Sequence, residues 1–589
     1  MPNVNGSFQG ATLILPGVYY KDNVSAALPV GAATTPPLIF IGFGYGGKPQ
    51  TPLYHATQQG ISAQLRGAPA TEFVKFFMTP SGEVAGAQQI TYINPAPNTQ
   101  STLSLLDGAS TPVAVINLTS ADYGTPSNLL QAQVQAGTIG GIELTLYDGY
   151  ANVTAVGNNL GLPFQIAYTG SATTVTYSVT ATDFTLTSPT AGESVTFPLG
   201  TGAYETIATL VEGINGTGHY VAQTISDTNG NLPSTSLDIV SDVALPAPTS
   251  GVYDYVNVTA VLGDPVFWVN TYAAALASAA IASGVTSGSS TAPAVIPMTF
   301  FTGATNVVPT LQDYANALNL ALTLPGWAVI MDTNQSGISA LGTQHVLTAS
   351  SITNHRYRRY FTGSSVGDSI SVTQANARSM NAKEASYCYP GIWRTSLSTG
   401  VNTLYGGLYW AACCAGIACG NRVAVPMTNK SLIGNGVEVA LTTPDINQLQ
   451  GAGVMCLRVP DSTGVPTIVR DLTTWQNDNN PENVNNQQVA CRQALAYSMI
   501  ATLSPYVGQI NAGTISLGRV KNTVKSLLNA MLYSAPGSSG ILAAWDAKSL
   551  SLTYNGGTQT LGVTVSVQFV GQNVFITVFV PVQPLMAAA

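Results

Sequence analysis

The sequence predicts an α+β multidomain protein, with an α/β domain, an α+β C-terminal domain, a β-rich inserted domain and two terminal arms. Three observations support this fold class. The chain has 589 residues, enough for about three to five domains. Residues 96–260 alternate Thr, Val and Ser with regular Gly, Asn and Pro breaks, which is typical of antiparallel strands. After Pro265, Ala-rich helical segments alternate with short apolar strands, which indicates an α/β layer.

Composition excludes several classes of protein. Charged residues make up 8% of the chain, against about 25% in an ordinary soluble protein. Hydrophobic residues make up 45%, which argues against disorder, and scarce Lys and Glu argue against long coiled coils. A net charge of −8 argues against a general nucleic-acid binder, because phosphate contacts need a basic surface. The class of protein that these exclusions leave is a large, β-rich protein that assembles with other chains.

Charge is distributed unevenly along the chain. Between Lys75 and Arg356 there are 16 acidic residues and no Lys or Arg. From Arg356 onward, 15 basic residues outnumber 9 acidic ones. One interpretation is that a low-charge insertion simply lacks Lys. The other is that the acidic part faces solvent while the basic part faces an acidic partner.

The first 95 residues are divided into an N-terminal arm, residues 1–30, and a small β/α segment, residues 31–95. In the arm, the apolar segment Ala11–Leu15 predicts a strand, and the Pro16 that follows suits an edge better than a central strand. In the β/α segment, residues 37–41 predict a second strand that runs into a glycine-rich turn. Residues 96–260 form the predicted β-rich insertion.

Residues 261–399 form the predicted α/β domain. Helices are expected at Tyr272–Ala282 and Leu311–Leu322, and a strand at residues 327–331. The longest weakly polar stretch, residues 266–285, is dominated by Ala and Ser, so a packed helix is favoured over a membrane span.

Residues 400–569 form the predicted C-terminal domain, and residues 570–589 form a C-terminal arm. Helices are expected at Asn486–Leu503 and Ile515–Leu532, where apolar residues recur at helical spacing. Three basic residues beside the second apolar stripe are expected to be exposed: Arg519, Lys521 and Lys525. Two strands are expected at the end of the chain, Leu561–Phe569 and Val574–Val580. A terminal strand this apolar forms a sheet edge that needs a partner strand.

The start of the sequence shows neither the basic nor the apolar region of a secretory signal. The six cysteines have no CxxC pair and no nearby histidine, so zinc is disfavoured and buried free thiols are favoured over disulfides. They are Cys388, Cys413, Cys414, Cys419, Cys456 and Cys491.

A Gly-x-Gly-x-x-Gly motif at Gly42, Gly44 and Gly47 follows a predicted strand, as in dinucleotide-binding proteins. Two prolines, Pro49 and Pro52, follow at once and prevent the helix that would hold the phosphates. The favoured interpretation is a glycine-rich turn.

Catalytic and metal chemistry find little support. Residues 378–382 resemble a subtilisin-type serine motif around Ser379, but no histidine has the expected neighbours and no triad spacing is present. The basic-aromatic cluster at residues 355–360 could bind a single nucleic-acid strand, although a salt-bridge strip is favoured. We therefore predict no enzymatic activity, no metal and no cofactor.

Several motifs resemble the tail sheath proteins of contractile-tailed bacteriophages and related contractile injection systems. Near the start, residues 15–20 (LPGVYY) are similar to the family's Pro-Gly-Val-Tyr element, and residues 40–49 to the strand and glycine turn that follow it. In residues 389–393, YPGIW resembles the strand that closes the family's α/β domain. The strongest stretch is 426–589, where the order of strands and helices is that of the family's C-terminal domain. Residues 96–260 show no such similarity.

The resemblance implies a structural subunit that forms stacked hexameric rings around a tail tube and contracts to drive the tube through the host envelope. It implies a subtilisin-like but non-catalytic α/β domain, an innermost C-terminal domain and an insertion on the outside. The implied partners are neighbouring sheath subunits, the tail tube protein, and baseplate and tail terminator proteins, without nucleic acid or membrane insertion. The implied location is the virion tail, after assembly in the host cytoplasm.

The resemblance also implies that the terminal arms add strands to neighbouring subunits, a form of β-augmentation. The residues expected to take part are Leu13, Ile14, Leu15, Val18, Tyr19, Val574, Phe575, Ile576, Val578 and Phe579. Arg519, Lys521 and Lys525 are expected to face an acidic tube. Two alternatives stay open: a β-rich virion coat or surface protein, which needs no strand exchange, and a serine hydrolase built on the α/β layer.

Overall fold

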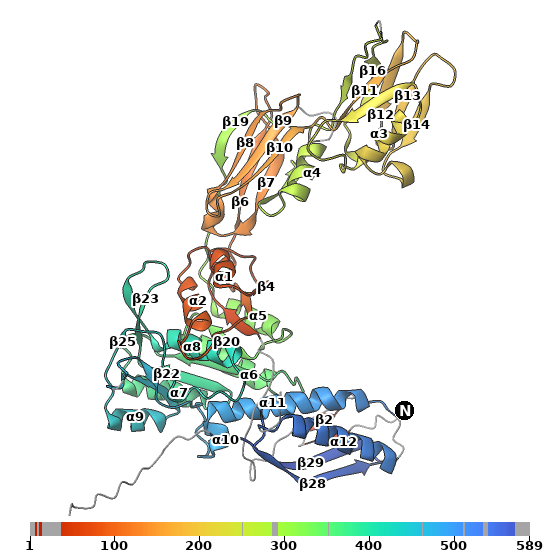
Figure 1. Ribbon diagram of the computed structural model, residues 1–589. Helices are drawn as coiled ribbons and strands as arrows, with labels where there is room; N and C mark the ends of the chain where they lie inside the picture. Colours follow the sequence, from red (N-terminus) through yellow and green to blue (C-terminus); the bar gives the residue numbers. More distant parts are fainter. Residues whose placement is uncertain are drawn as a thin grey trace, which may run out of the picture. The chain divides into compact units, whose positions relative to one another are not determined.

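The computed structural model describes residues 6–8, 11–13, 37–249, 251–285, 292–351, 353–461, 463–509, 513–533 and 540–571. The chain divides into two compact units (Figure 1). We call the first unit the body; it comprises residues 1–44, 50–96 and 309–589. We call the second the insertion; it comprises residues 45–49 and 97–308.

An eight-stranded sheet forms the centre of the body. Its six middle strands are parallel, and the two edge strands, β27 and β4, are antiparallel to their neighbours. From edge to edge the order is β27 (Thr467–Ile468), β26 (Val454–Arg458), β22 (Ala385–Tyr389), β21 (Arg359–Gly363), β20 (Ala328–Met331), β3 (Leu38–Ile41), β5 (Ile90–Ile93) and β4 (Pro52–His55).

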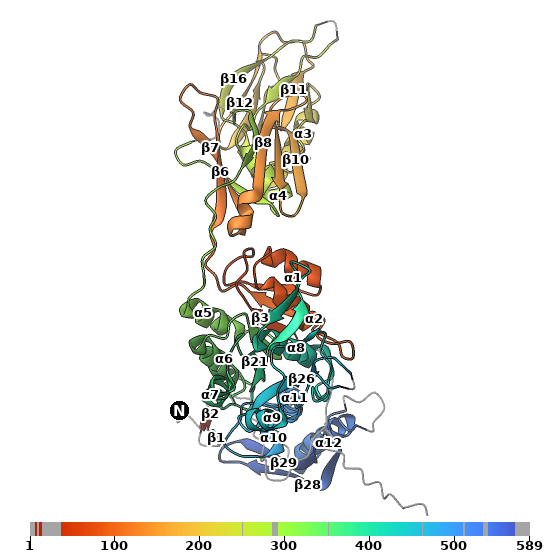
Figure 2. The same ribbon diagram turned by 90° about the vertical axis from the view of Figure 1, so that its left-hand side faces the viewer.

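Both faces of this sheet are buried, which explains the continuous apolar runs of its strands. In β3, Leu38 and Phe40 point into one core and Ile39 and Ile41 into another. The first face is covered by α1 (Gln58–Leu65), α2 (Thr71–Met78) and α8 (Gly407–Gly420). The second is covered by α5 (Leu311–Ala321), α6 (Ser336–Ala349), α7 (Ile370–Met380) and α9 (Thr443–Gln450), and Figure 2 shows α5, α6 and α7 in succession along it.

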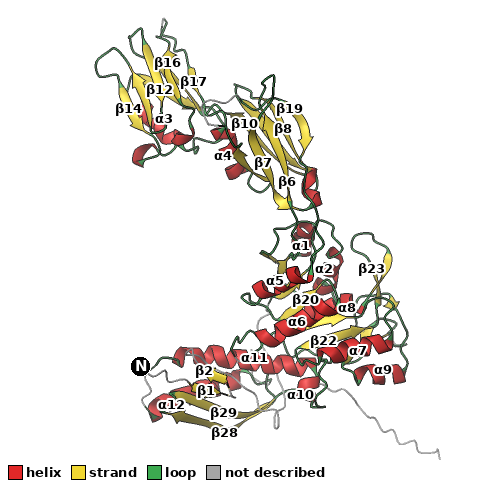
Figure 3. Cartoon of the chain, turned by 180° about the vertical axis from the view of Figure 1, so that it is seen from behind, coloured by secondary structure: helices red, strands yellow, loops and turns green. Residues whose placement is uncertain are grey.

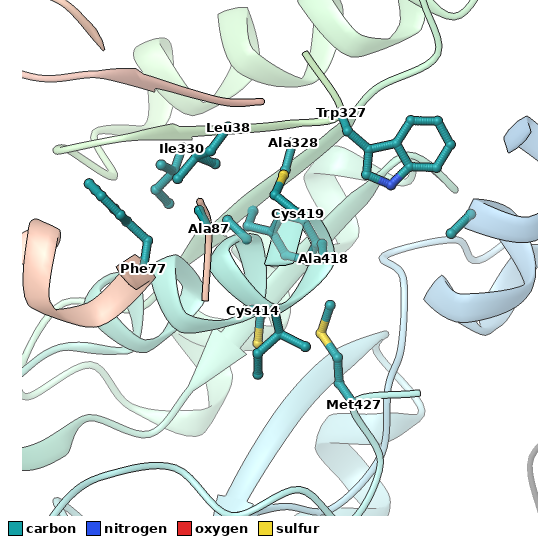
Figure 4. Close-up of a cluster of buried hydrophobic side chains, with 14 of the residues drawn as sticks. Leu38, Phe77, Ala87, Trp327, Ala328, Ile330, Cys414, Ala418, Cys419 and Met427 are labelled. Carbon is teal, nitrogen blue, oxygen red and sulfur yellow. The ribbon is translucent and has the colours of Figure 1, made fainter. Parts of the chain in front are cut away.

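Helix α8 lies at the middle of the larger core. Its buried residues include Cys414, Ala418 and Cys419, and Figure 4 shows Cys419 beside Ala328 of the sheet and Cys414 on the side of Met427. Its glycines allow close approach of backbone: a Cβ on Gly416 would lie 2.1 Å from the carbonyl oxygen of Phe77 in α2. Buried residues occupy every side of α8, and this explains why its sequence is apolar throughout.

The C-terminal part of the body shares this core. Helices α11 (Asn486–Leu503) and α12 (Thr514–Ala530) and the hairpin of β28 (Ala544–Asn555) and β29 (Thr560–Gln568) contribute to the same apolar cluster. Short elements complete the body: the hairpin of β1 (Gly6–Phe8) and β2 (Ala11–Leu13), the sheet of β24 (Asn402–Tyr405), β23 (Ile392–Thr395) and β25 (Gly436–Val437), and α10 (Pro481–Val484). The predicted segments 261–399 and 400–569 are thus joined by one sheet and one core from residue 309 onward.

The insertion consists of two nested β domains (Figure 3). The proximal domain contains the sheet β18 (Ala277–Ile281), β7 (Ala114–Tyr123), β6 (Gln100–Leu106), and the sheet β10 (Val153–Leu160), β9 (Ile142–Asp148), β8 (Leu130–Ala136), β19 (Ile296–Phe300), with helix α4 (Gly263–Tyr272). The distal domain contains the sheet β15 (Tyr220–Thr224), β11 (Phe164–Tyr168), β17 (Val256–Val258), and the sheet β14 (Val195–Pro198), β13 (Asp183–Thr187), β12 (Val175–Val179), β16 (Val240–Leu245), with helix α3 (Ile207–Asn215).

The predicted antiparallel character of the insertion is confirmed, but one predicted helix is wrong. Residues 272–282 hold the end of α4 and then strand β18, which pairs with β7 from Ala277 to Ile281. The small side chains of β18 alternate between buried and exposed, so tertiary pairing overrides their helical composition. The insertion as a structural unit consequently continues to Val308, beyond the predicted end at residue 260.

Other predicted elements agree with the structure. The helix expected at Asn486–Leu503 is α11 with the same bounds, and the strand at residues 327–331 is β20. Strand β28 was missed, although its alternating Leu550–Tyr554 segment and the Asn555-Gly556 turn that follows form a hairpin signal. The strand predicted at Val574–Val580 lies outside the described residues.

Candidate assembly surfaces

In the part of the chain that the structure describes, the C-terminal hairpin has unpaired strand edges. Strands β28 and β29 pair antiparallel from Tyr554↔Leu561 to Ala544↔Gln568, and no third strand joins them among the described residues. One face packs on the body core through Leu552, Val563 and related residues. The free edges present backbone donors and acceptors that another strand can pair with.

Most residues predicted to exchange strands are not described. Leu13 ends β2, whose backbone pairs with β1 through Leu13↔Gly6. The others lie outside the described residues: Ile14, Leu15, Val18, Tyr19, Val574, Phe575, Ile576, Val578 and Phe579. Strand exchange through these residues stays a prediction.

Helix α12 brings together two of the three predicted basic residues. Val520, Val524 and Leu528 form its buried stripe. At about 3.6 residues per turn, Lys521 and Lys525 lie on one flank of that stripe and Arg519 on the other. The outward positions between the flanks, including Asn522 and Ser526, are uncharged.

A polar pocket of about 250 Å³ between α6 and α7 contains the serine of the subtilisin-like motif. Ser379 donates a hydrogen bond to the carbonyl oxygen of Asn376 at 2.7 Å. The lining contains Asn, Ser, Ala, Thr, Gln, Leu, Met and Tyr residues, and therefore no histidine or carboxylate that could act as a base. The pocket gives the hydrolase alternative no support.

The basic-aromatic cluster is largely internal. Arg358 is fully buried and donates to the carbonyl oxygens of Ala321 and Leu324 at the end of α5, and to His345 Nε2 at 2.9 Å. Burial and the charge of Arg358 lower the pKa of His345 to about 3, so this imidazole is neutral and accepts the bond. Arg358 stabilises a helix C-terminus, where carbonyl groups lack partners.

Arg359 of the same cluster links the sheet to α11. It is 3% exposed and donates to Asn486 Oδ1 at 3.1 Å. Its guanidinium carbon lies 5.5 Å from the centre of the Trp327 ring, a cation–π contact. The hypothesis of an intersubunit or intrachain salt-bridge strip is wrong for Arg358 and Arg359, because neither forms an ion pair with a described carboxylate and both are buried within the body.

The glycine-rich motif is a turn, as predicted. Its backbone donates to side chains of the chain itself: Phe43 N to Asp332 Oδ2 at 2.7 Å and Gly47 N to Asp122 Oδ1 at 2.6 Å. Strand β4 follows the turn, where a dinucleotide site would need a helix. The six cysteines are all buried and free, and burial raises the pKa of Cys413 to about 12.

The described residues contain no group of three His, Cys, Asp or Glu side chains placed to hold a metal ion. None of their helices has the length and apolar character needed to span a bilayer.

A buried carboxylate, which the sequence did not reveal, fixes the β23–β24 hairpin to α2. Glu72 accepts hydrogen bonds from the backbone N–H of Leu397 at 2.8 Å and of Ser398 at 2.9 Å. The hydroxyls of Ser396, Ser398 and Tyr405 also donate to it, at 2.6–2.8 Å. Beside it, Arg394 donates to the carbonyl oxygens of Lys75 and Thr79 at the end of α2.

We expect Glu72 to make the stability of the body depend on acidic pH. Burial alone would raise the pKa of Glu72, but the bonds from Ser398, Leu397 and Ser396 lower it to about 2, against 4.5 for a free glutamate. Glu72 therefore stabilises the folded body fully above about pH 4.5, and this contribution of about 2–3 kcal/mol is lost as the pH falls toward 2. Thermal unfolding of wild type and Glu72→Gln should differ most at neutral pH and converge in acid. A constant difference between them across that range would contradict this assignment.

The similarity of this chain to known proteins lies in its sequence and in its fold. No protein-family model matches the chain. A tail sheath protein of Bacillus phage SP01 is 23% identical over 487 residues, which is 80% of each chain. Among solved structures, the sheath tail protein of Listeria innocua superposes with a TM-score of 0.57 at 10% identity, covering 92% of this chain and 94% of that one. The sheath tail protein of Desulfitobacterium hafniense gives a TM-score of 0.49 at 10% identity, covering 91% and 93%. In sequence and in fold the chain is therefore similar to the sheath proteins of contractile tails, and the resemblance that its motifs indicate is confirmed.

Proposed function

We propose that the chain is a structural tail sheath subunit that polymerises as stacked hexameric rings around a tail tube and contracts to drive the tube through a host envelope. The observation that carries this proposal is the two-stranded C-terminal hairpin with both edges unpaired among the described residues. Similarity to a tail sheath protein along 80% of the chain supports it. The implied location is the virion tail.

Subunits are joined when terminal arms add strands to the C-terminal hairpins of neighbours. Main-chain hydrogen bonds hold such a link, so it survives while the attached bodies change orientation. The shared core of the body, from α8 to β29, supports movement of the body as one rigid piece. Contraction is then a rigid-body transition between two packings of the same linked subunits.

In this arrangement the C-terminal part of the body lies innermost and the insertion faces outward. The lysine pair Lys521 and Lys525 on α12 contacts an acidic tube, and Arg519 contributes from the opposite flank. The insertion suits an outer surface because residues 97–308 contain 13 acidic residues and no Lys or Arg. The parallel sheet of the body has the subtilisin-like fold of the family. We propose that this fold does not catalyse hydrolysis here, because the lining of the pocket around Ser379 has no histidine or carboxylate to act as a base.

Negative-stain electron microscopy of the purified chain tests the proposal. We expect hollow striated tubes or stacked rings, formed by the chain alone or with a co-expressed tube protein as template. Uniform single particles in both preparations would contradict a sheath and favour a coat or surface protein, which needs no strand exchange.

A further inference from the structure

Two short linkers carry the chain between the proximal and distal domains of the insertion, and α4 also contacts the distal domain: Phe267 packs against the distal core and Tyr272 donates to Thr228 O at 2.8 Å. The chain enters the distal domain through residues 158–163, the end of β10 and the turn after it, and leaves it through residues 258–264, the turn after β17 and the start of α4. Leu160 and Leu262 belong to the proximal core, whereas Phe164 and Val258 belong to the distal core. Every change in the orientation of the distal domain must therefore bend these two linkers.

The linkers are held together by backbone bonds and by three aspartates. Ala260 N donates to Gly161 O at 3.0 Å. Gly161 N donates to Asp264 Oδ2, Val261 N to Asp238 Oδ2 and Asn158 N to Asp227 Oδ2, each at 2.9 Å. Each linker thus depends on a carboxylate to fix its path.

Asp264 differs from the other two because it is fully buried. It is 0% exposed, and its Oδ1 atom has no hydrogen-bond partner within 3.5 Å, although the hydroxyl of Ser226 faces the carboxyl. The other ionisable groups at the joint are carboxyls as well, Asp227 and Asp238. Residues 97–308 contain no Lys or Arg, and their one histidine, His219, lies beside Glu193 in the distal domain. The one lysine of the insertion, Lys48, follows Gly47, whose N–H donates to Asp122 in the proximal domain, so residues 97–308 themselves offer no lysine or arginine to compensate an ionised Asp264.

A buried carboxyl without a compensating cation favours its neutral form. Burial, the largest cause, together with the charge of Asp227 raises the pKa of Asp264 to about 7, even though the Gly161 N–H and the Ser226 hydroxyl lower it. In an opened joint, where water reaches the carboxyl, the pKa returns toward the ordinary 3.8. The closed joint therefore holds a proton that the open joint releases.

We propose that these linkers form a proton-controlled hinge, in which the neutral Asp264 carboxyl keeps the two nested domains fixed and proton release frees the distal domain to pivot. The sign follows from linkage: protons bind the closed state more tightly, so the closed state is favoured in acid. The opening equilibrium rises from about pH 4 to about pH 7 and is constant above that. This hinge does not depend on the proposed sheath function, because it lies within a single chain.

Hydrogen–deuterium exchange of the full chain at pH 5 to 8, corrected for intrinsic exchange rates, tests the hinge. In wild type, the amides of Gly161 and Val261 should lose protection by tens of fold between about pH 5 and pH 7.5. In Asp264→Asn, whose amide stays neutral, protection should be the same at every pH. The exposed Asp254→Asn serves as the matched control and should follow the wild-type profile.

Two results would overturn the hinge. One is wild-type protection that does not change with pH at these amides. The other is a pH profile of Asp264→Asn that coincides with that of wild type. If Asp264→Asn does not fold, the profiles of wild type and Asp254→Asn still show whether protection at these amides changes with pH.

Discussion

A single methyl group at Gly416 should destabilise the body substantially. Gly416 lies in the middle of α8, and a Cβ there would sit 2.1 Å from Phe77 O and 2.8 Å from Phe77 Cα. Both are backbone atoms of α2, so no side-chain rotation relieves the contact, and α8 and α2 must separate. Overpacking of this kind costs about 1–3 kcal/mol, or more where backbone must move. Because the body is large, this loss corresponds to a fall in its melting temperature of roughly 1–4 °C in Gly416→Ala.

Gly518→Ala is the matched control. Gly518 lies in the interior of α12, and a Cβ there would meet no atom within 4 Å. Alanine exceeds glycine in helix propensity by about 1 kcal/mol, so this substitution should leave stability unchanged or raise it slightly. Calorimetry of both variants separates the two effects. Equal melting temperatures for Gly416→Ala and wild type would show that α8 and α2 can move apart without cost.

The sequence predicts those elements whose own residues carry the pattern. Helix α11 has the predicted bounds because apolar positions recur at helical spacing through Leu503. The strands β3 and β20 are short apolar runs, as buried parallel strands must be. Strand β18 was misassigned because Ala and Ser favour no face by hydrophobicity, and only pairing with β7 decides its conformation.

Tertiary contacts explain the predictions that failed at the candidate sites. Arg358 and Arg359 sit in a basic cluster that resembles a surface strip, yet the end of α5 and the indole of Trp327 enclose them. Glu72 gives no signal in sequence because its partners, residues 396–405, are more than three hundred residues away. Helical spacing, by contrast, was enough to predict the apolar stripe of α12, of which Val520, Val524 and Leu528 are buried.

Removing residues 572–589 should abolish assembly while leaving the chain folded. The deletion removes the predicted strand Val574–Val580 and retains β28 and β29, whose inner face packs on the body core. Each truncated subunit keeps the hairpin, whose edges are unpaired among the described residues, but has no C-terminal strand to offer a neighbour. We expect thermal unfolding close to that of wild type and no tubes or rings by electron microscopy.

A shorter deletion, of residues 581–589, distinguishes loss of the strand from loss of the tail. It retains Val574–Val580, so it should assemble as wild type does. Intact tubes from the longer deletion would refute strand exchange through the C-terminal arm, because no segment after Gly571 would then be needed. Loss of tubes in both deletions would instead show that the Pro581–Ala589 tail, which both deletions remove, is itself required for assembly. Strand exchange is supported only if the two deletions differ, since they differ only in the predicted strand and the residues 572–573 that lead to it.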